Sequence, residues 1–115
     1  APHVAYTMAK YGMSMCVLGM AEEFRSDGIA VNALWPRTVI TTAALAMLGG
    51  VIKPDNCRKP DIMADAAHAV LTQSARETTG NFFIDDEVLA AAGVADFDQY
   101  AVDPGRELAV DLFVD

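Results

Sequence analysis

The residues of this 115-residue chain best suited to chemistry are a tyrosine and a lysine near its start. Tyr6 and Lys10 form a Tyr-x-x-x-Lys pair, and residues four apart on a helix lie on one face, one turn up. A phenol ionises at about pH 10, and a nearby ammonium favours the ionised form, so the pair could exchange a proton with a ligand. The spacing alone is a weak signal, because a packed tyrosine ring beside a snorkelling lysine has the same spacing.

A helix over residues 4–25 is predicted to carry this pair, and it is apolar on almost every side. Such a helix must be buried on more than one side, so its methionines are expected to serve core or dimer packing. Cys16 is expected to be a small buried hydrophobe, and Gly28 suits the position just past the helix end. A membrane span over residues 4–21 is the alternative. Lys10 argues against it, because a lysine near the bilayer centre costs about 2.5–3.5 kcal/mol.

The remaining hydrophobic pattern predicts two sheet strands and a second long helix. The apolar run at 29–35, ended by Pro36, is typical of a strand buried on both faces of a parallel sheet. Residues 80–84 are predicted to form another strand. A helix is predicted from near Pro60, because proline and the acid Asp61 suit a first turn. Its predicted apolar stripe consists of Ile62, Met63, Ala66, Ala67, Val70 and Leu71. The pattern is completed by a short helix at 41–48 ended by Gly49-Gly50, a loop at 51–59 and a helical segment at 87–92.

Strand, helices and strand in this order form a parallel crossover unit of an α/β protein. Two strands and two long helices cannot cover each other's apolar faces, so further strands are needed. The chain also begins Ala1-Pro2-His3, without an initiator methionine or a signal pattern, which favours a fragment. We therefore predict that residues 1–115 are the C-terminal part of a single domain, a doubly wound parallel sheet whose N-terminal half lies upstream of residue 1.

The net charge of −8 is concentrated late in the chain, where residues 85–115 carry nine acids and one base. Such a surface repels phosphate backbones, so we expect no nucleic-acid partner. Asp85 and Asp86 follow a strand but lack an evident third ligand, so a turn is expected there and no metal site. The two cysteines have neither disulfide-framework nor zinc-ligand spacing, which suits a reducing compartment, cytoplasmic or organellar. His68 is expected on the solvated polar face of its helix.

The order of the segments strengthens the tyrosine–lysine signal. The strand after the first helix ends in Asn32-Ala33-Leu34-Trp35-Pro36-Arg37-Thr38-Val39-Ile40-Thr41. This order resembles the second half of the short-chain dehydrogenase/reductase family, in which a Tyr-x-x-x-Lys helix precedes a strand ending in Asn-x-x-x-Pro-Gly-x-Val/Ile-x-Thr. The segments YGMSMCVLGMAEEF, VNALWPRT, TTAALAMLGG, TGNFFIDDEVL and FDQYAVDPG resemble its hydroxysteroid dehydrogenase-like branch. The extended epimerase/dehydratase group also has Tyr-x-x-x-Lys, but it usually carries a longer C-terminal substrate domain.

The resemblance implies a Rossmann-type fold and an oxidoreductase. Such an enzyme transfers hydride between a nicotinamide cofactor, NAD or NADP, and a small-molecule carbonyl or alcohol substrate. It implies that Tyr6 is the acid/base, and that Lys10 tunes it and bonds the nicotinamide ribose. The residues of the following loop that it places near the nicotinamide are Pro36, Arg37, Thr38, Val39 and Thr41. Of these, the Val39 backbone and the Thr41 hydroxyl would grip the carboxamide, at the carboxyl end of the strand where ligands bind in such folds.

The chain departs from the family pattern in two respects. Arg37 stands where the family has glycine, and it is expected either to reach a cofactor phosphate or acidic substrate, or to face solvent. The family's Gly-rich cofactor loop, catalytic serine and active-site asparagine are absent, so the chain alone is not expected to bind a dinucleotide tightly.

Residues 41–52 would form the substrate lid, with an apolar lining. The family pairs the first helix with its copy in another subunit, so a homo-oligomer through helix 4–25 is expected. The alternative function is a catalytically inactive association module that uses the same helix.

Overall fold

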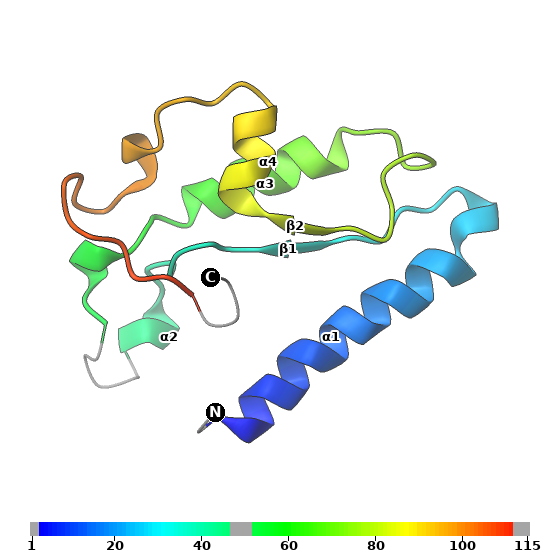
Figure 1. The fold of residues 1–115 in the computed structure, drawn as a ribbon, viewed down its shortest axis with the longest axis horizontal. Helices are drawn as coiled ribbons and strands as arrows, with labels where there is room; N and C mark the ends of the chain where they lie inside the picture. Colours follow the sequence, from blue (N-terminus) through cyan, green and yellow to red (C-terminus); the bar gives the residue numbers. More distant parts are fainter. Residues whose placement is uncertain (1–2, 47–51, 112–115) are drawn as a thin grey trace. The chain divides into compact units, whose positions relative to one another are not determined.

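The computed structural model describes residues 3–46 and 52–111 of the chain (Figure 1). Its helices and strands are α1 (Val4–Glu23), β1 (Ala33–Trp35), α2 (Ala43–Ala46), α3 (Asp61–Leu71), β2 (Phe82–Ile84) and α4 (Asp85–Ala91). Short 3-10 helices among the described residues are η1 (Arg25–Asp27), η2 (Pro54–Asn56) and η3 (Asp98–Tyr100). The chain divides into two compact units, the first made of Ala1–Ala33 with Leu71–Phe83, the second of Leu34–Val70 with Ile84–Asp115.

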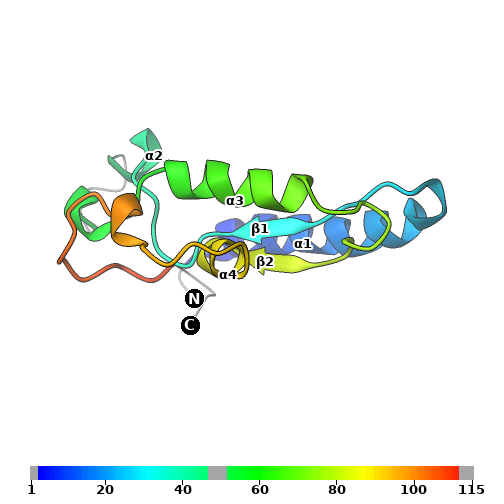
Figure 2. The ribbon, with the colours of Figure 1, turned by 90° about the horizontal axis from the view of Figure 1, so that it is seen from above.

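Strands β1 and β2 pair side by side in a two-stranded sheet (Figure 2). Just before the strands, the Gly80 N–H donates to the Val31 carbonyl over 2.8 Å, and the Ala33 N–H donates to the Asn81 carbonyl over 2.9 Å. Residue numbers rise together along both segments, which is the parallel arrangement. The predicted α/β class and the parallel pairing are therefore confirmed.

Each strand has three residues, which is shorter than the predicted runs at 29–35 and 80–84. A side chain replaces one main-chain ladder bond ahead of β1, since the Val31 N–H donates to Thr79 Oγ1 over 3.0 Å. Regular pairing consequently begins only at Ala33. Strand β1 is half-buried along its length, so the prediction of burial on both faces is not met within the described residues.

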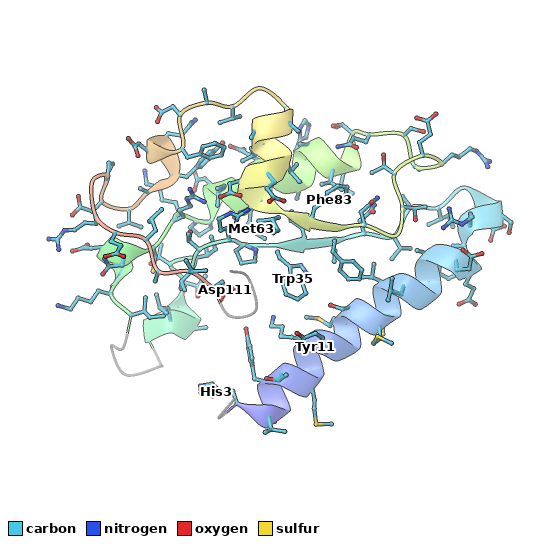
Figure 3. All side chains as sticks on the ribbon, in the orientation of Figure 1. His3, Tyr11, Trp35, Met63, Phe83 and Asp111 are labelled. Atoms are coloured by element: carbon cyan, nitrogen blue, oxygen red, sulfur yellow. The ribbon has the colours of Figure 1, made fainter. Side chains whose placement is uncertain are left out.

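Helix α1 has nearly the predicted length, but most of its apolar side chains are exposed. Val17 and Ala21 are its buried residues, whereas Met15 is 67% exposed. Figure 3 shows side chains projecting around α1, Tyr11 among them. The predicted burial on more than one side is therefore not provided by the described part of the chain, and the prediction of a buried Cys16 is wrong, because it is exposed. Among the described residues, no helix is long and apolar enough to cross a membrane.

The end of the first helical region depends on a glycine. After α1 and η1, Gly28 adopts φ 71°, in the left-handed region. A Cβ at this position would meet only the flexible end of the Arg76 side chain, so it is the backbone conformation that favours glycine. The predicted stop at Gly28 is confirmed.

In the second unit, α3 buries apolar side chains on one face. The helix begins directly after Pro60, as predicted, and the Pro60 carbonyl accepts from the Met63 N–H over 3.0 Å. Ile62 and Ala66 are fully buried. The predicted apolar stripe is wrong at Leu71, which is 82% exposed because the helix ends there. The other buried apolar residues in the described part of this unit are Leu45, Cys57, Val88, Leu89, Tyr100 and Ala101.

Helix α4 begins at Asp85, directly after β2, where a turn was predicted. Asp85, Asp86 and Glu87 occupy its first turn, where negative charge is favoured by the helix dipole. The helical segment predicted at 87–92 therefore begins earlier than expected, and the prediction of a turn is wrong.

The segment between β1 and α3 is described only in part. Helix α2 confirms the start of the short helix predicted at 41–48, and η2 lies inside the predicted loop at 51–59. The predicted helix end at Gly49-Gly50 and residues 47–51 of the expected lid lie outside the described residues.

Candidate active site

Tyr6 and Lys10 lie together in the first turns of α1, as their spacing predicts. The Lys10 ammonium nitrogen stands 5.4 Å from the centroid of the Tyr6 ring, within the range of a cation–π contact. Tyr6 is 46% exposed, and Lys10 is half-buried. The helix thus presents a phenol and an ammonium side by side, with the phenol accessible in the described part of the chain.

The loop after β1, residues 36–41, is held along one edge by main-chain hydrogen bonds. The Val39 N–H donates to the Ala109 carbonyl over 2.8 Å, and the Val39 carbonyl accepts from the Arg58 N–H over 3.0 Å. The Thr41 N–H donates to the Arg58 carbonyl over 2.9 Å. Both main-chain groups of Val39 are therefore engaged inside the second unit. The Val39 carbonyl keeps a second lone pair, and the carboxamide contact expected of the Val39 backbone stays a prediction.

The side chains of this loop are held more firmly than the sequence suggests. Thr38 is buried, and its hydroxyl has no hydrogen-bond partner among the described residues. Arg37 is half-buried, and its guanidinium donates to Asp86 over 2.9 Å and to Glu87 over 2.8 Å. Hydrogen bonding to Asp86 raises the pKa of Arg37. Arg37 was predicted either to reach an anionic group of a ligand or to face solvent. In the structure its guanidinium is instead paired with acids of α4.

Asp85 is the residue of this region that sequence reasoning missed. Its side chain is fully buried, and Oδ1 accepts from the Arg37 N–H over 3.1 Å and from the Asp86 N–H over 2.7 Å. Oδ2 has no hydrogen-bond partner among the described residues. Burial raises the pKa of Asp85, and the two backbone hydrogen bonds oppose that rise. The available signal was an acid placed directly after an apolar strand. Within residues 3–46 and 52–111, no three His, Cys, Asp or Glu side chains are grouped to hold a metal ion.

Replacing Asp85 with asparagine should make stability less dependent on pH. The folded-state pKa of Asp85 is raised above its ordinary 3.8, so its contribution to stability is fullest below that value and is lost as pH rises through the folded-state pKa. Asparagine keeps an oxygen that can accept from the two N–H groups but carries no charge. Asp85→Asn should therefore gain stability relative to wild type as pH rises from about 3 to about 7. Urea unfolding across this range measures the gain, and a constant difference between the proteins would contradict the burial argument.

Each unit brings its own share of the predicted residues together. In the first unit, Tyr6 and Lys10 are in contact on α1. In the second, Pro36 to Thr41 form one extended loop, bridged to Arg58 and to Val110. Pro36 and Thr41 are half-buried in that loop. That these residues bind a nicotinamide cofactor stays a prediction.

Comparison with known proteins finds relatives that are all named as dehydrogenases or dehydrogenase-like proteins. No protein-family model matches the chain. The chain is 59% identical over 113 residues to hydroxysteroid dehydrogenase-like protein 2 of Xenopus laevis, and 60% identical over 113 residues to the protein of that name from Danio rerio. Each alignment covers 98% of this chain and 27% of the relative.

Two solved structures share the fold. One, from Xanthomonas campestris and provisionally described as a dehydrogenase, matches with a TM-score of 0.91 at 58% identity, covering 97% of this chain and 41% of that one. A short chain dehydrogenase structure from Mycobacterium thermoresistibile matches with a TM-score of 0.85 at 50% identity, covering 96% of this chain and 39% of that one.

The chain spans about a quarter of the length of these curated relatives and about two fifths of the solved chains. Identity of 50% or more extends over nearly all of the chain, and the fold agrees over the same length. Over nearly its whole length, the chain is similar in sequence to hydroxysteroid dehydrogenase-like proteins, and in sequence and fold to a solved short chain dehydrogenase.

Proposed function

We propose that this chain is part of a longer oxidoreductase that transfers hydride between a nicotinamide cofactor, NAD or NADP, and a carbonyl/alcohol pair. The observation that carries the proposal is the Tyr6–Lys10 contact, in which an ammonium stands 5.4 Å from the ring of an accessible phenol. The likeness to proteins named as dehydrogenases supports the reaction class, and their names give no substrate. In particular, no steroid substrate follows from them.

The proposed chemistry assigns each of the two residues a physical task. When hydride reaches a carbonyl carbon, the oxygen needs a proton, and the Tyr6 hydroxyl can supply it. A neighbouring ammonium stabilises the phenolate left behind. Lys10 would also bond the nicotinamide ribose and so orient the cofactor, which contributes through positioning.

The chain's residues fit the nicotinamide end of such a cofactor. The cofactor would supply the hydride, and the chain presents a donor pair at Tyr6 and Lys10. The loop at 36–41 would add contacts to the carboxamide through the Val39 backbone and the Thr41 hydroxyl. The sequence contains no Gly-rich phosphate loop, so the pyrophosphate end would be held by residues outside this chain.

The reaction class is tested by a hydride-transfer assay on the full-length protein. The protein is incubated with NAD or NADP and a panel of primary and secondary alcohols, and reduced nicotinamide is followed by its absorbance. We expect formation of reduced cofactor with at least one alcohol class. A folded protein that binds neither cofactor and turns over no member of the panel would count against the proposal.

The exposed apolar surface of α1 favours a second candidate, an association module. Among its side chains, Val4, Met8 and Met15 are each about two-thirds exposed, and a contiguous apolar surface of this kind marks an interaction site. This candidate requires a stable homo-oligomer with no cofactor affinity. Light scattering of the full-length protein gives the oligomeric state, and a nicotinamide titration of the same sample separates the two candidates. An oligomer that also binds cofactor fits the enzyme, whereas an oligomer that does not fits the module.

A further inference from the structure

Arg37 is bound by three consecutive acids at the start of α4. Its N–H donates to Asp85 Oδ1 over 3.1 Å, and its Nε donates to both carboxylate oxygens of Asp86, each over 2.9 Å. Its Nη2 donates to Glu87 Oε1 over 2.8 Å. A residue of the loop after β1 is thereby attached, through both its main chain and its side chain, to the helix that follows β2.

Asp86 has a second cationic partner, Arg58. The Arg58 Nη1 donates to Asp86 Oδ2 over 3.2 Å, and the Arg58 side chain is only 9% exposed. Its guanidinium carbon lies 5.6 Å from the centroid of the Phe97 ring, and its Nε has no hydrogen-bond partner among the described residues. Loss of Asp86 would leave a buried cation without its carboxylate, which is costly. Glu87 differs, because its side chain is 63% exposed and such pairs contribute little.

Arg58 also holds the same loop through its main chain. Its N–H donates to the Val39 carbonyl, and its carbonyl accepts from the Thr41 N–H. The contacts of Arg37, Asp86 and Arg58 therefore form a closed network that begins and ends in the loop. The Arg37 side chain meets Asp86, Asp86 meets the Arg58 side chain, and the Arg58 backbone returns to Val39 and Thr41. Both ends of the loop segment 37–41 are tied to one carboxylate and one arginine.

We propose that Asp86 is a positioning residue that fixes the shape of the 36–41 loop for its ligand by bridging Arg37 and Arg58. The inference rests on the proposed function for what the loop binds. A loop already held in one conformation loses less conformational entropy when a ligand binds. Arg37 then links the loop to α4, as a strut between them, and does not itself contact a phosphate or an acidic substrate.

The experiment compares Asp86→Asn with the matched control Glu87→Gln in the full-length protein. The first readout is hydrogen exchange at the Arg37, Val39 and Thr41 amides. The second is the affinity for reduced nicotinamide cofactor, together with kcat at saturating cofactor. We expect faster exchange at these amides in Asp86→Asn, cofactor affinity weakened by roughly tenfold and kcat changed by less than about twofold. Glu87→Gln should resemble wild type in every readout.

A third variant, Arg37→Met, separates a strut from a direct ligand contact. If Arg37 acts through Asp86, Arg37→Met should weaken cofactor binding no more than Asp86→Asn, which also loses the Arg58 contact. The double variant should then bind no more weakly than Asp86→Asn alone. If Arg37 binds an anionic ligand itself, Arg37→Met would weaken binding while Asp86→Asn would leave it unchanged or strengthen it, and the proposal is overturned. Unaltered exchange in Asp86→Asn, or equal effects in Glu87→Gln, also overturns it. Absence of cofactor binding by wild type refutes the proposed function instead, and the exchange comparison alone then decides whether the strut exists.

Discussion

Tyr6→Phe should abolish turnover by the full-length enzyme while leaving cofactor binding close to wild type. The substitution removes only the hydroxyl, so the ring and its contact with Lys10 are kept. Without that hydroxyl, the carbonyl oxygen has no proton donor at this position as hydride arrives. General acid catalysis contributes about 10²–10⁴-fold, so kcat should fall by at least about 10². Steady-state kinetics and a cofactor titration on the same preparation measure the two effects separately.

Tyr11→Phe is the matched control for this experiment. Tyr11 lies on the same helix and is also exposed, so its variant removes a hydroxyl from α1 outside the Tyr-x-x-x-Lys pair. We expect its kcat to stay within about twofold of wild type. Retained turnover in Tyr6→Phe, or equal losses in both variants, would show that Tyr6 is not the acid/base.

Ile62→Ala should have the largest effect on stability of any simple truncation in α3. Ile62 is fully buried, and removing three carbons from a packed site loses transfer free energy and leaves a cavity. The free energy of unfolding should fall by about 3 kcal/mol, within the range of about 2–5 kcal/mol for such truncations. That is a large share of the stability of a domain, which is about 5–15 kcal/mol. Urea denaturation gives the difference.

Leu71→Ala provides the comparison on the same helix. Leu71 was predicted from its spacing to share the apolar stripe with Ile62, but it is 82% exposed. Its truncation should change the free energy of unfolding by less than about 0.5 kcal/mol, as at other surface sites. Comparable losses in the two variants would mean that α3 buries its last residue as well as its first turn.

Features set by local chemistry were predictable from the sequence. The Tyr6–Lys10 contact follows from helical spacing, the stop at Gly28 from a conformation that glycine adopts readily, and the start of α3 from the proline at Pro60. The parallel pairing of the two apolar runs followed from their hydropathy and from the helices between them. In each case the residues that determine the feature are neighbours in the sequence, or they recur with the period of a helix or strand.

Features that depend on a distant partner were not predictable. The Arg37–Asp86 contact joins residues 49 apart, and no local pattern says which acid an arginine will meet. Asp85 was expected in a turn, and its burial could not be foreseen. That burial depends on the distant loop residue Arg37, whose N–H donates to the Asp85 carboxylate. The exposure of α1 has the same origin, since its composition shows that it needs cover but not what supplies it.

The most direct test of the central claim is a fluorescence titration of full-length wild-type and Lys10→Met proteins with reduced nicotinamide dinucleotide. If Tyr6 and Lys10 act at the nicotinamide, wild type should bind saturably. The variant should bind at least about tenfold more weakly, because it loses a charged hydrogen bond worth about 1.5–3 kcal/mol. Equal affinity in the two proteins, or no saturable binding by folded wild type, would contradict the account.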